Sequence, residues 1–167
     1  MNKFVLGLAV GATLAVIVAA APAFAEEIAV EAALFPKEQI ELPFQDDSRR
    51  SVRLTRREGQ ATGTGPLAGA GVAEYGFHDL APGVGGEAFG YLVFSRADGV
   101  AYVRWNVRGA FVKGEDGVPA LVNSGFWEIV GGTGRFKALK GAGAIHIKLV
   151  GSVERRYVLT GRIAPRD

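Results

Sequence analysis

The sequence predicts an all-β domain, either a sandwich or a barrel, behind a cleaved export signal. From Ser51 onward, short runs of β-branched and aromatic residues alternate with glycine-rich turns, which is the pattern of an antiparallel β domain. No long segment carries the hydrophobic period of a helix. The chain also begins with a charged residue, an apolar run and a small-residue cleavage site, in the order found in secretory signal peptides.

Residues 1–25 are expected to be removed on export. Lys3 precedes the uncharged apolar run Phe4–Ala21, and Ala23-Phe24-Ala25 supplies the cleavage site. A permanent anchor is the alternative, since a run of this length could just span a bilayer, but the adjacent cleavage site favours removal. The chain has no cysteine, which excludes a lipoprotein anchor. We therefore expect a periplasmic or secreted protein with no stable membrane anchor after cleavage.

The composition excludes several function classes. Without cysteine the chain has no disulfides, thiolate nucleophiles or thiolate-bound metals. The net charge is only +2, and Lys3 is the one charged residue of the leader. The mature chain is therefore nearly neutral overall, so no global field points to nucleic acid as a partner.

The mature chain divides into two expected parts. Residues 26–50 are expected to form an N-terminal strand or arm followed by a loop, and residues 51–167 the barrel domain. The apolar run Ile28–Phe35 fits either a strand or a helix. Pro36 and Pro43 then interrupt any regular pattern.

A hairpin is expected around Asp98-Gly99. This dipeptide between two β-type runs is typical of a type I′ turn, and such a turn pairs Ala97 with Val100. The opposite, polar face then includes Arg104 and Asn106. Five apolar side chains gather on the other face, as core or as cavity wall: Leu92, Phe94, Val103, Trp105 and Val107.

The last hairpin is expected to have a three-residue loop, Gly151–Val153. This register sets Ile147 against Tyr157, whereas a two-residue turn would mismatch apolar and charged side chains. His146 then faces solvent.

The stretch between these hairpins carries a family resemblance. A strand runs into Gly131-Gly132-Thr133-Gly134-Arg135-Phe136, and Gly141-Ala142-Gly143 opens the next strand. Upstream, His78-Asp79 precedes a glycine-rich loop and the strand Gly90–Phe94. Over residues 70–163 this arrangement resembles the allene oxide cyclase and dirigent barrel family.

The resemblance implies an eight-stranded antiparallel barrel with a central cavity, often assembled as trimers. Relatives bind apolar or phenolic small molecules and steer cyclisation or radical coupling largely by shape. The glycine element is expected to shape a tight corner between strands, so the catalytic residues stay unknown. We expect no cofactor.

Two histidines and a basic cluster need separate interpretation. His78 and His146 do not form a metal-ligand pair, so no metal site is expected. His78 is expected at an exposed strand end, with an acid or base at the barrel rim as the alternative. The cluster Arg49-Arg50, Arg53 and Arg56-Arg57 favours a solvated outer strand, with an anionic partner as the alternative.

Three function classes stay open. The favoured one is a module that binds a small apolar or aromatic molecule in its lumen. The second is a cyclase or isomerase, which would need a polar group such as Arg104, Asn106 or Glu128 to face inward. We expect Glu128 to be a surface charge instead. The third is a structural or surface-interaction protein with a packed lumen. The candidate ligand-binding residues are Leu92, Phe94, Val103, Trp105, Val107 and His78.

Overall fold

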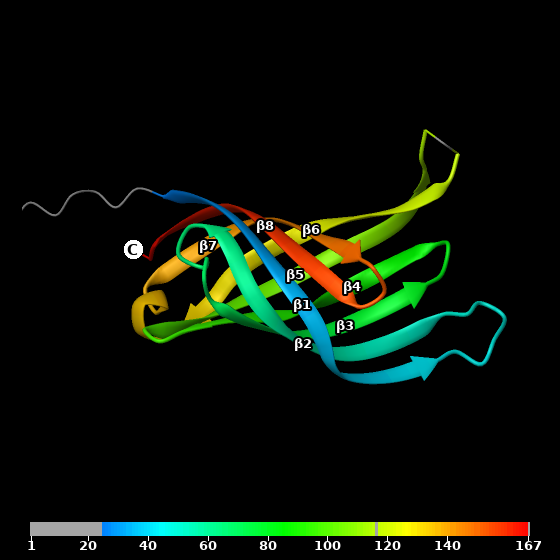
Figure 1. The fold of residues 1–167 in the computed structure, drawn as a ribbon, viewed down its shortest axis with the longest axis horizontal. Helices are drawn as coiled ribbons and strands as arrows, with labels where there is room; N and C mark the ends of the chain where they lie inside the picture. Colours follow the sequence, from blue (N-terminus) through cyan, green and yellow to red (C-terminus); the bar gives the residue numbers. More distant parts are fainter. Residues whose placement is uncertain (1–24, 116, 167) are drawn as a thin grey trace, which may run out of the picture.

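The protein is a closed barrel of eight antiparallel strands, each paired with its neighbours in chain order (Figure 1). The structure is a computed structural model that describes residues 25–115 and 117–166, so the predicted signal sequence lies outside the described residues except for Ala25. The predicted all-β class and eight-stranded barrel are confirmed. The elements are β1 Glu26–Pro43, β2 Ser51–Thr64, β3 Gly71–Ala81, β4 Gly85–Arg96, β5 Gly99–Lys113, β6 Pro119–Gly132, the 3-10 turn η1 Gly134–Phe136, β7 Leu139–Val150 and β8 Glu154–Pro165.

The segment predicted as an N-terminal strand or arm is a strand of the barrel itself. β1 pairs with β2, and its first half, Glu26–Leu34, pairs with β8 to close the barrel. Alternate residues such as Ile28 and Val30 are buried, as a half-buried strand requires. The register shifts between Pro36 and Glu38, where proline cannot donate to the ladder.

The β4–β5 hairpin has the predicted faces but not the predicted turn. Its turn residues are Ala97 and Asp98, and Arg96 pairs with Gly99. The predicted pairing is therefore wrong by two residues in register, a shift that leaves every side chain on its expected face. Gly99 has a φ of 151°, and a Cβ there would lie 2.3 Å from the carbonyl oxygen of Thr133. The glycine serves this close approach rather than a type I′ turn.

The β7–β8 hairpin follows the predicted register. Val150 pairs with Glu154 across a loop of residues 151–153, and Ile147 pairs with Tyr157. His146 is exposed on the outer face, where its Nδ1 lies 2.9 Å from the carbonyl oxygen of Asn123. Matching apolar partners across the hairpin thus selected the correct register.

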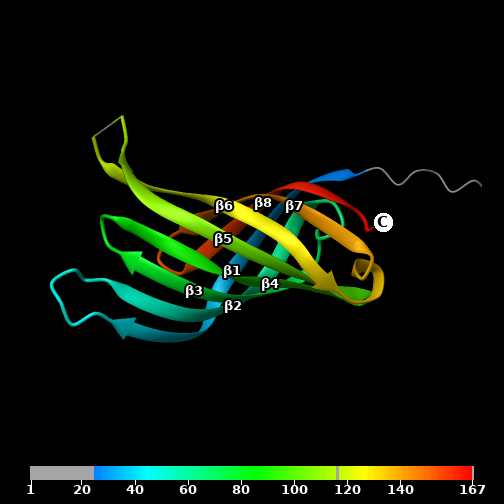
Figure 2. The ribbon, with the colours of Figure 1, turned by 180° about the vertical axis from the view of Figure 1, so that it is seen from behind.

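One end of the barrel is packed solid. The loop between β2 and β3 brings Leu67 into the interior, and η1 brings in Phe136; both are fully buried at the same end of the barrel (Figures 1 and 2). The large side chains that fill the interior are Leu34, Leu92, Phe94, Trp105, Trp127, Ile145, Tyr157 and Leu159. Four of the predicted apolar set, Leu92, Phe94, Val103 and Trp105, are at most 1% exposed.

The Gly-Gly-Thr-Gly element turns β6 into η1 at this packed end. A Cβ at Gly132 would lie 2.8 Å from Phe136 Cβ and 2.8 Å from the carbonyl oxygen of Val100. Gly134 has a φ of 54° and faces the backbone of Asp98. Because neighbouring atoms approach so closely, Gly132 and Gly134 cannot be replaced by a residue with a side chain without a shift of the structure.

The other end of the barrel flares. The β1–β2, β3–β4 and β5–β6 hairpins extend past the β7–β8 turn (Figures 1 and 2). β6 pairs with β7 only over Gly125–Glu128. Further toward the flared end, the Asn123 side chain replaces the backbone ladder between β6 and β7. It accepts a hydrogen bond from the Ile147 backbone N–H at 2.6 Å and donates one to the Ile147 carbonyl. In the part of the chain that the structure describes, no helix reaches the length and hydrophobicity needed to cross a bilayer.

Candidate ligand-binding cavity

A cavity of about 510 Å³ opens into the barrel at its flared end. Its lining comes from all eight strands and from the loops after β1 and β3. This volume lies in the range of small-molecule sites, which are typically about 300–1,000 Å³. The barrel interior therefore consists of a packed half and an open half.

The predicted ligand-binding residues divide between these two halves. Val107 and His78 line the cavity, whereas Leu92, Phe94 and Val103 fill the packed half and lie outside the lining. Trp105 also lies outside the lining, directly beneath it. Its ring meets Tyr157 edge-on at a centroid distance of 5.5 Å and lies 5.9 Å from the His78 ring. Trp105 thus supports the cavity floor from below.

The wall of the cavity has two chemically different sides. One side, from β4 to β7, is mainly apolar, with Glu87 and Asn123 as its polar members. The other side, from β2 and β8, is basic and carries Arg53, Arg57 and Arg155. The principal apolar lining residues are Ala88, Val107, Phe111, Leu121, Ile147 and Leu149.

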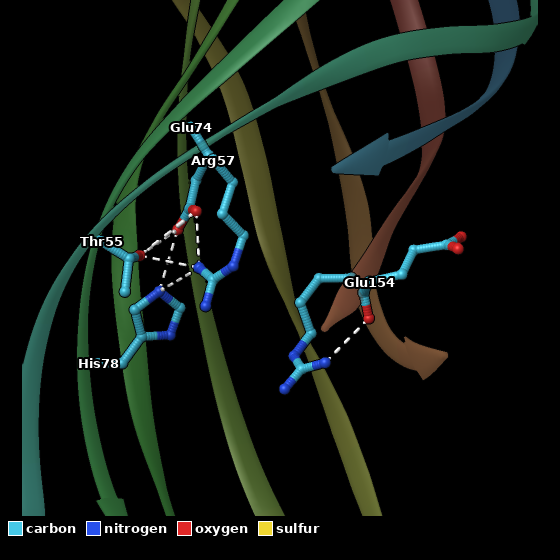
Figure 3. Close-up of polar contacts among 6 residues, drawn as sticks. Thr55, Arg57, Glu74, His78 and Glu154 are labelled. Carbon is cyan, nitrogen blue, oxygen red and sulfur yellow. Dashed lines mark hydrogen bonds and ion pairs between the residues drawn. The ribbon is translucent and has the colours of Figure 1, made fainter. Parts of the chain in front are cut away.

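A buried polar cluster lies at the base of the basic side, on β2 and β3 (Figure 3). Arg57 Nη1 donates to Glu74 Oε2 at 2.7 Å and to Thr55 Oγ1 at 2.8 Å. His78 Nε2 lies 2.9 Å from Glu74 Oε1. Arg57 and Glu74 are direct cross-strand partners, and Thr55 faces Gly76. A Cβ at Gly76 would lie 2.0 Å from Glu74 Oε1, so this glycine provides the space that the carboxylate occupies.

Glu74 is ionised within this cluster. Burial alone would raise the pKa of its carboxyl, but the hydrogen bond from His78 and then the charge of Arg57 outweigh burial and hold the pKa below its ordinary value. An ionised carboxylate only accepts hydrogen bonds, and a guanidinium only donates. His78 Nε2 therefore donates to Glu74, and its second ring nitrogen points away from Glu74 (Figure 3).

Tyr157 brings a hydroxyl to the cavity floor. Its side chain is fully buried, and its hydroxyl oxygen has no hydrogen-bond partner among the described residues. Burial, and then the charge of Glu74, raise the pKa of this hydroxyl well above its ordinary value. The hydroxyl therefore stays protonated and can donate a hydrogen bond.

Two sequence interpretations are corrected here. His78 is not at an exposed strand end: it lies within β3, 8% exposed, and faces the lumen. The basic cluster is not a solvated outer strand either, because Arg53 and Arg57 point inward while Leu54 and Arg56 point outward. The period-2 alternation was right, but the inward face was assigned wrongly, since an interior open to water at one end accepts charged side chains.

The polar groups considered for an enzyme in the lumen lie elsewhere. Arg104 and Asn106 are on the outer surface, and Glu128 forms an ion pair with Arg104 there. The surface assignment of Glu128 is therefore confirmed. Sequence reasoning missed Glu74, Thr55 and the inward facing of Arg57. The signal that was present is the alternation Ser51, Arg53, Thr55, Arg57 on one face.

The described part of the chain contains no group of three or more histidine, aspartate or glutamate side chains arranged to hold a metal ion. In comparisons with known proteins, no family model matches the chain and no curated protein matches it significantly.

Proposed function

We propose that this protein is an exported barrel of the allene oxide cyclase and dirigent type that binds a small apolar or aromatic molecule in the open half of its lumen. The observation that carries the proposal is the cavity of about 510 Å³, with an apolar wall and an unpartnered Tyr157 hydroxyl in its floor. Pockets that combine apolar walls with a few convergent polar groups are typical small-molecule sites. The eight-stranded barrel is also the architecture that the family resemblance implies.

A cavity-filling variant tests this proposal. The probe is N-phenyl-1-naphthylamine, an uncharged aromatic dye whose emission rises in apolar surroundings. Ala88→Phe places a ring in the cavity, because Ala88 is buried and lines it. We expect this variant to lose about tenfold or more in probe affinity, since the added volume displaces the ligand.

The matched control is Ala110→Phe, which adds the same ring to the outer face of β5 and should leave probe affinity unchanged. If Ala88→Phe does not fold, Leu121→Trp fills the cavity from a less buried position. A folded, filled variant that binds the probe as well as the unaltered protein would refute lumen binding.

The second candidate is a cyclase or isomerase that uses the same cavity. The observation that favours it is the Glu74–His78 pair, which leaves one imidazole nitrogen turned away from the carboxylate. A histidine oriented by a carboxylate is a common general base. Under this candidate, His78→Gln would abolish turnover of a bound molecule while leaving its affinity within a few-fold, and equal loss of both would favour simple binding.

A further inference from the structure

Arg155 differs from Arg50, Arg53 and Arg57, which also line the cavity. Arg50, Arg53 and Arg57 each form an ion pair with a carboxylate, whereas Arg155 donates to the backbone carbonyl of Glu154 at 2.9 Å. Within the described ranges no carboxylate lies in ion-pair distance of it. Its guanidinium stays charged, because arginine is not deprotonated in proteins. It is therefore a partly buried cation without a counterion.

The surroundings of Arg155 make this charge more costly. Burial, and then the nearby charge of Arg57, lower the pKa of the Arg155 guanidinium. Five arginines line the cavity. Arg50, Arg53 and Arg57 are neutralised by ion pairs with carboxylates, and Arg49 is exposed to solvent. An anion placed in the cavity would compensate the charge of Arg155.

Tyr157 adds a hydrogen-bond donor beside this charge. Arg155 and Tyr157 are two residues apart on β8, so their side chains project from the same face of the strand, and both line the cavity. The Tyr157 hydroxyl is buried and forms no hydrogen bond within 3.5 Å among the described residues, although the Glu74 carboxylate lies close enough to raise its pKa. A guanidinium and a hydroxyl on one face form a natural cradle for an anionic oxygen group.

The opposite side of the cavity, from β5 to β7, carries no positively charged side chain among the described residues, so it offers no binding site for a second anionic group. Val107, Leu121, Ile147 and Leu149 line it from β5, β6 and β7. We propose that the ligand is an apolar molecule with a single anionic oxygen group, a carboxylate or sulfonate, which is held by the Arg155 guanidinium and the Tyr157 hydroxyl while its body packs on this apolar wall. This inference rests on the proposed function and names its ligand class.

Two matched dyes test the inference on the purified protein. One is 8-anilinonaphthalene-1-sulfonate, and the other is N-phenyl-1-naphthylamine, which has the same rings without the sulfonate. We expect the sulfonate to bind about tenfold or more tightly, as a charge-assisted contact allows. Added salt should weaken only the sulfonate, because only that dye forms an ion pair.

The decisive variant is Arg155→Met, which keeps an apolar stem of similar reach and removes the charge. We expect it to lower sulfonate affinity about tenfold and to leave the uncharged dye within about twofold. The control is Arg162→Met, which removes an exposed arginine that pairs with Glu27 and should change neither affinity. If Arg155→Met does not fold, Tyr157→Phe should also weaken the sulfonate selectively.

The outcomes separate the two proposals. Binding of neither dye to the unaltered protein would overturn lumen binding and with it the anion site. Equal binding of both dyes, or an Arg155→Met protein that keeps full sulfonate affinity, would overturn the anion site and leave lumen binding standing. An equal loss in Arg162→Met would also overturn it, since the effect would then come from net charge.

Discussion

The packed and flared ends of the barrel are built from the same strands, yet their inward-facing side chains behave differently. Along β5, Val103 and Trp105 are buried in solid core, while Val107 and Phe111 line the cavity. Along β8, Leu159 is packed and Arg155 lines the cavity. Strand alternation therefore determines which side chains face inward, whereas the barrel ends determine whether the interior is filled.

The physical difference lies in what covers each end. The packed end receives Leu67 and Phe136 from a loop and a short 3-10 turn, and both side chains are fully buried. At the flared end, long hairpins diverge, and the described residues of β6 that precede Gly125 have no ladder pairing with β7. An eight-stranded barrel can be filled by side chains or hold one small ligand, and this barrel combines both arrangements along its axis.

The largest expected effect comes from Glu74, which lies among the inward-facing side chains of β3. Glu74→Gln should lower the free energy of unfolding by about 3–5 kcal/mol at neutral pH, because it leaves the Arg57 charge buried without a counterion. Urea unfolding measures this loss. The control is Glu128→Gln, which breaks an exposed pair with Arg104 and should cost less than about 1 kcal/mol.

The same substitution should change the pH dependence of stability. In the folded protein the pKa of Glu74 lies below its ordinary value of 4.5, so in acid the unfolded chain takes up this proton first. The contribution of Glu74 is therefore fully present above pH 4.5 and is lost as the pH falls through its folded pKa. Glu74→Gln should show a shallower loss of stability in acid, and an unchanged acid profile would contradict the role of this ion pair.

A matched pair of leucines compares the two ends directly. Leu92 is fully buried in the packed half, and Leu121 is a partly buried residue of the cavity wall. Leu92→Ala should cost about 3 kcal/mol, whereas Leu121→Ala should cost about 1 kcal/mol, because the cavity already leaves that side chain with fewer contacts. Equal losses in denaturant unfolding would mean that the two halves are packed alike.

The sequence was sufficient for the barrel class, the β7–β8 register and the inward face of β4 and β5, because matched apolar residues repeat along those strands. It was insufficient for the cavity. Arg57 and His78 were assigned to the outside, since charged side chains normally face solvent, and only the flare of the barrel explains why they face the lumen. The Glu74 carboxylate gave no clear signal, because two of its partners, Thr55 and Arg57, come from β2.

The measurement that tests lumen binding most directly is a titration of isotope-labelled protein with N-phenyl-1-naphthylamine, followed by methyl nuclear magnetic resonance. We predict that the shifts concentrate on Val107, Leu121 and Ile147 of the cavity wall, while Leu67 and Leu92 of the packed half stay unmoved. Shifts confined to Ile40 and Leu54, which line an outer apolar groove, would contradict the account, as would no shift at saturating probe.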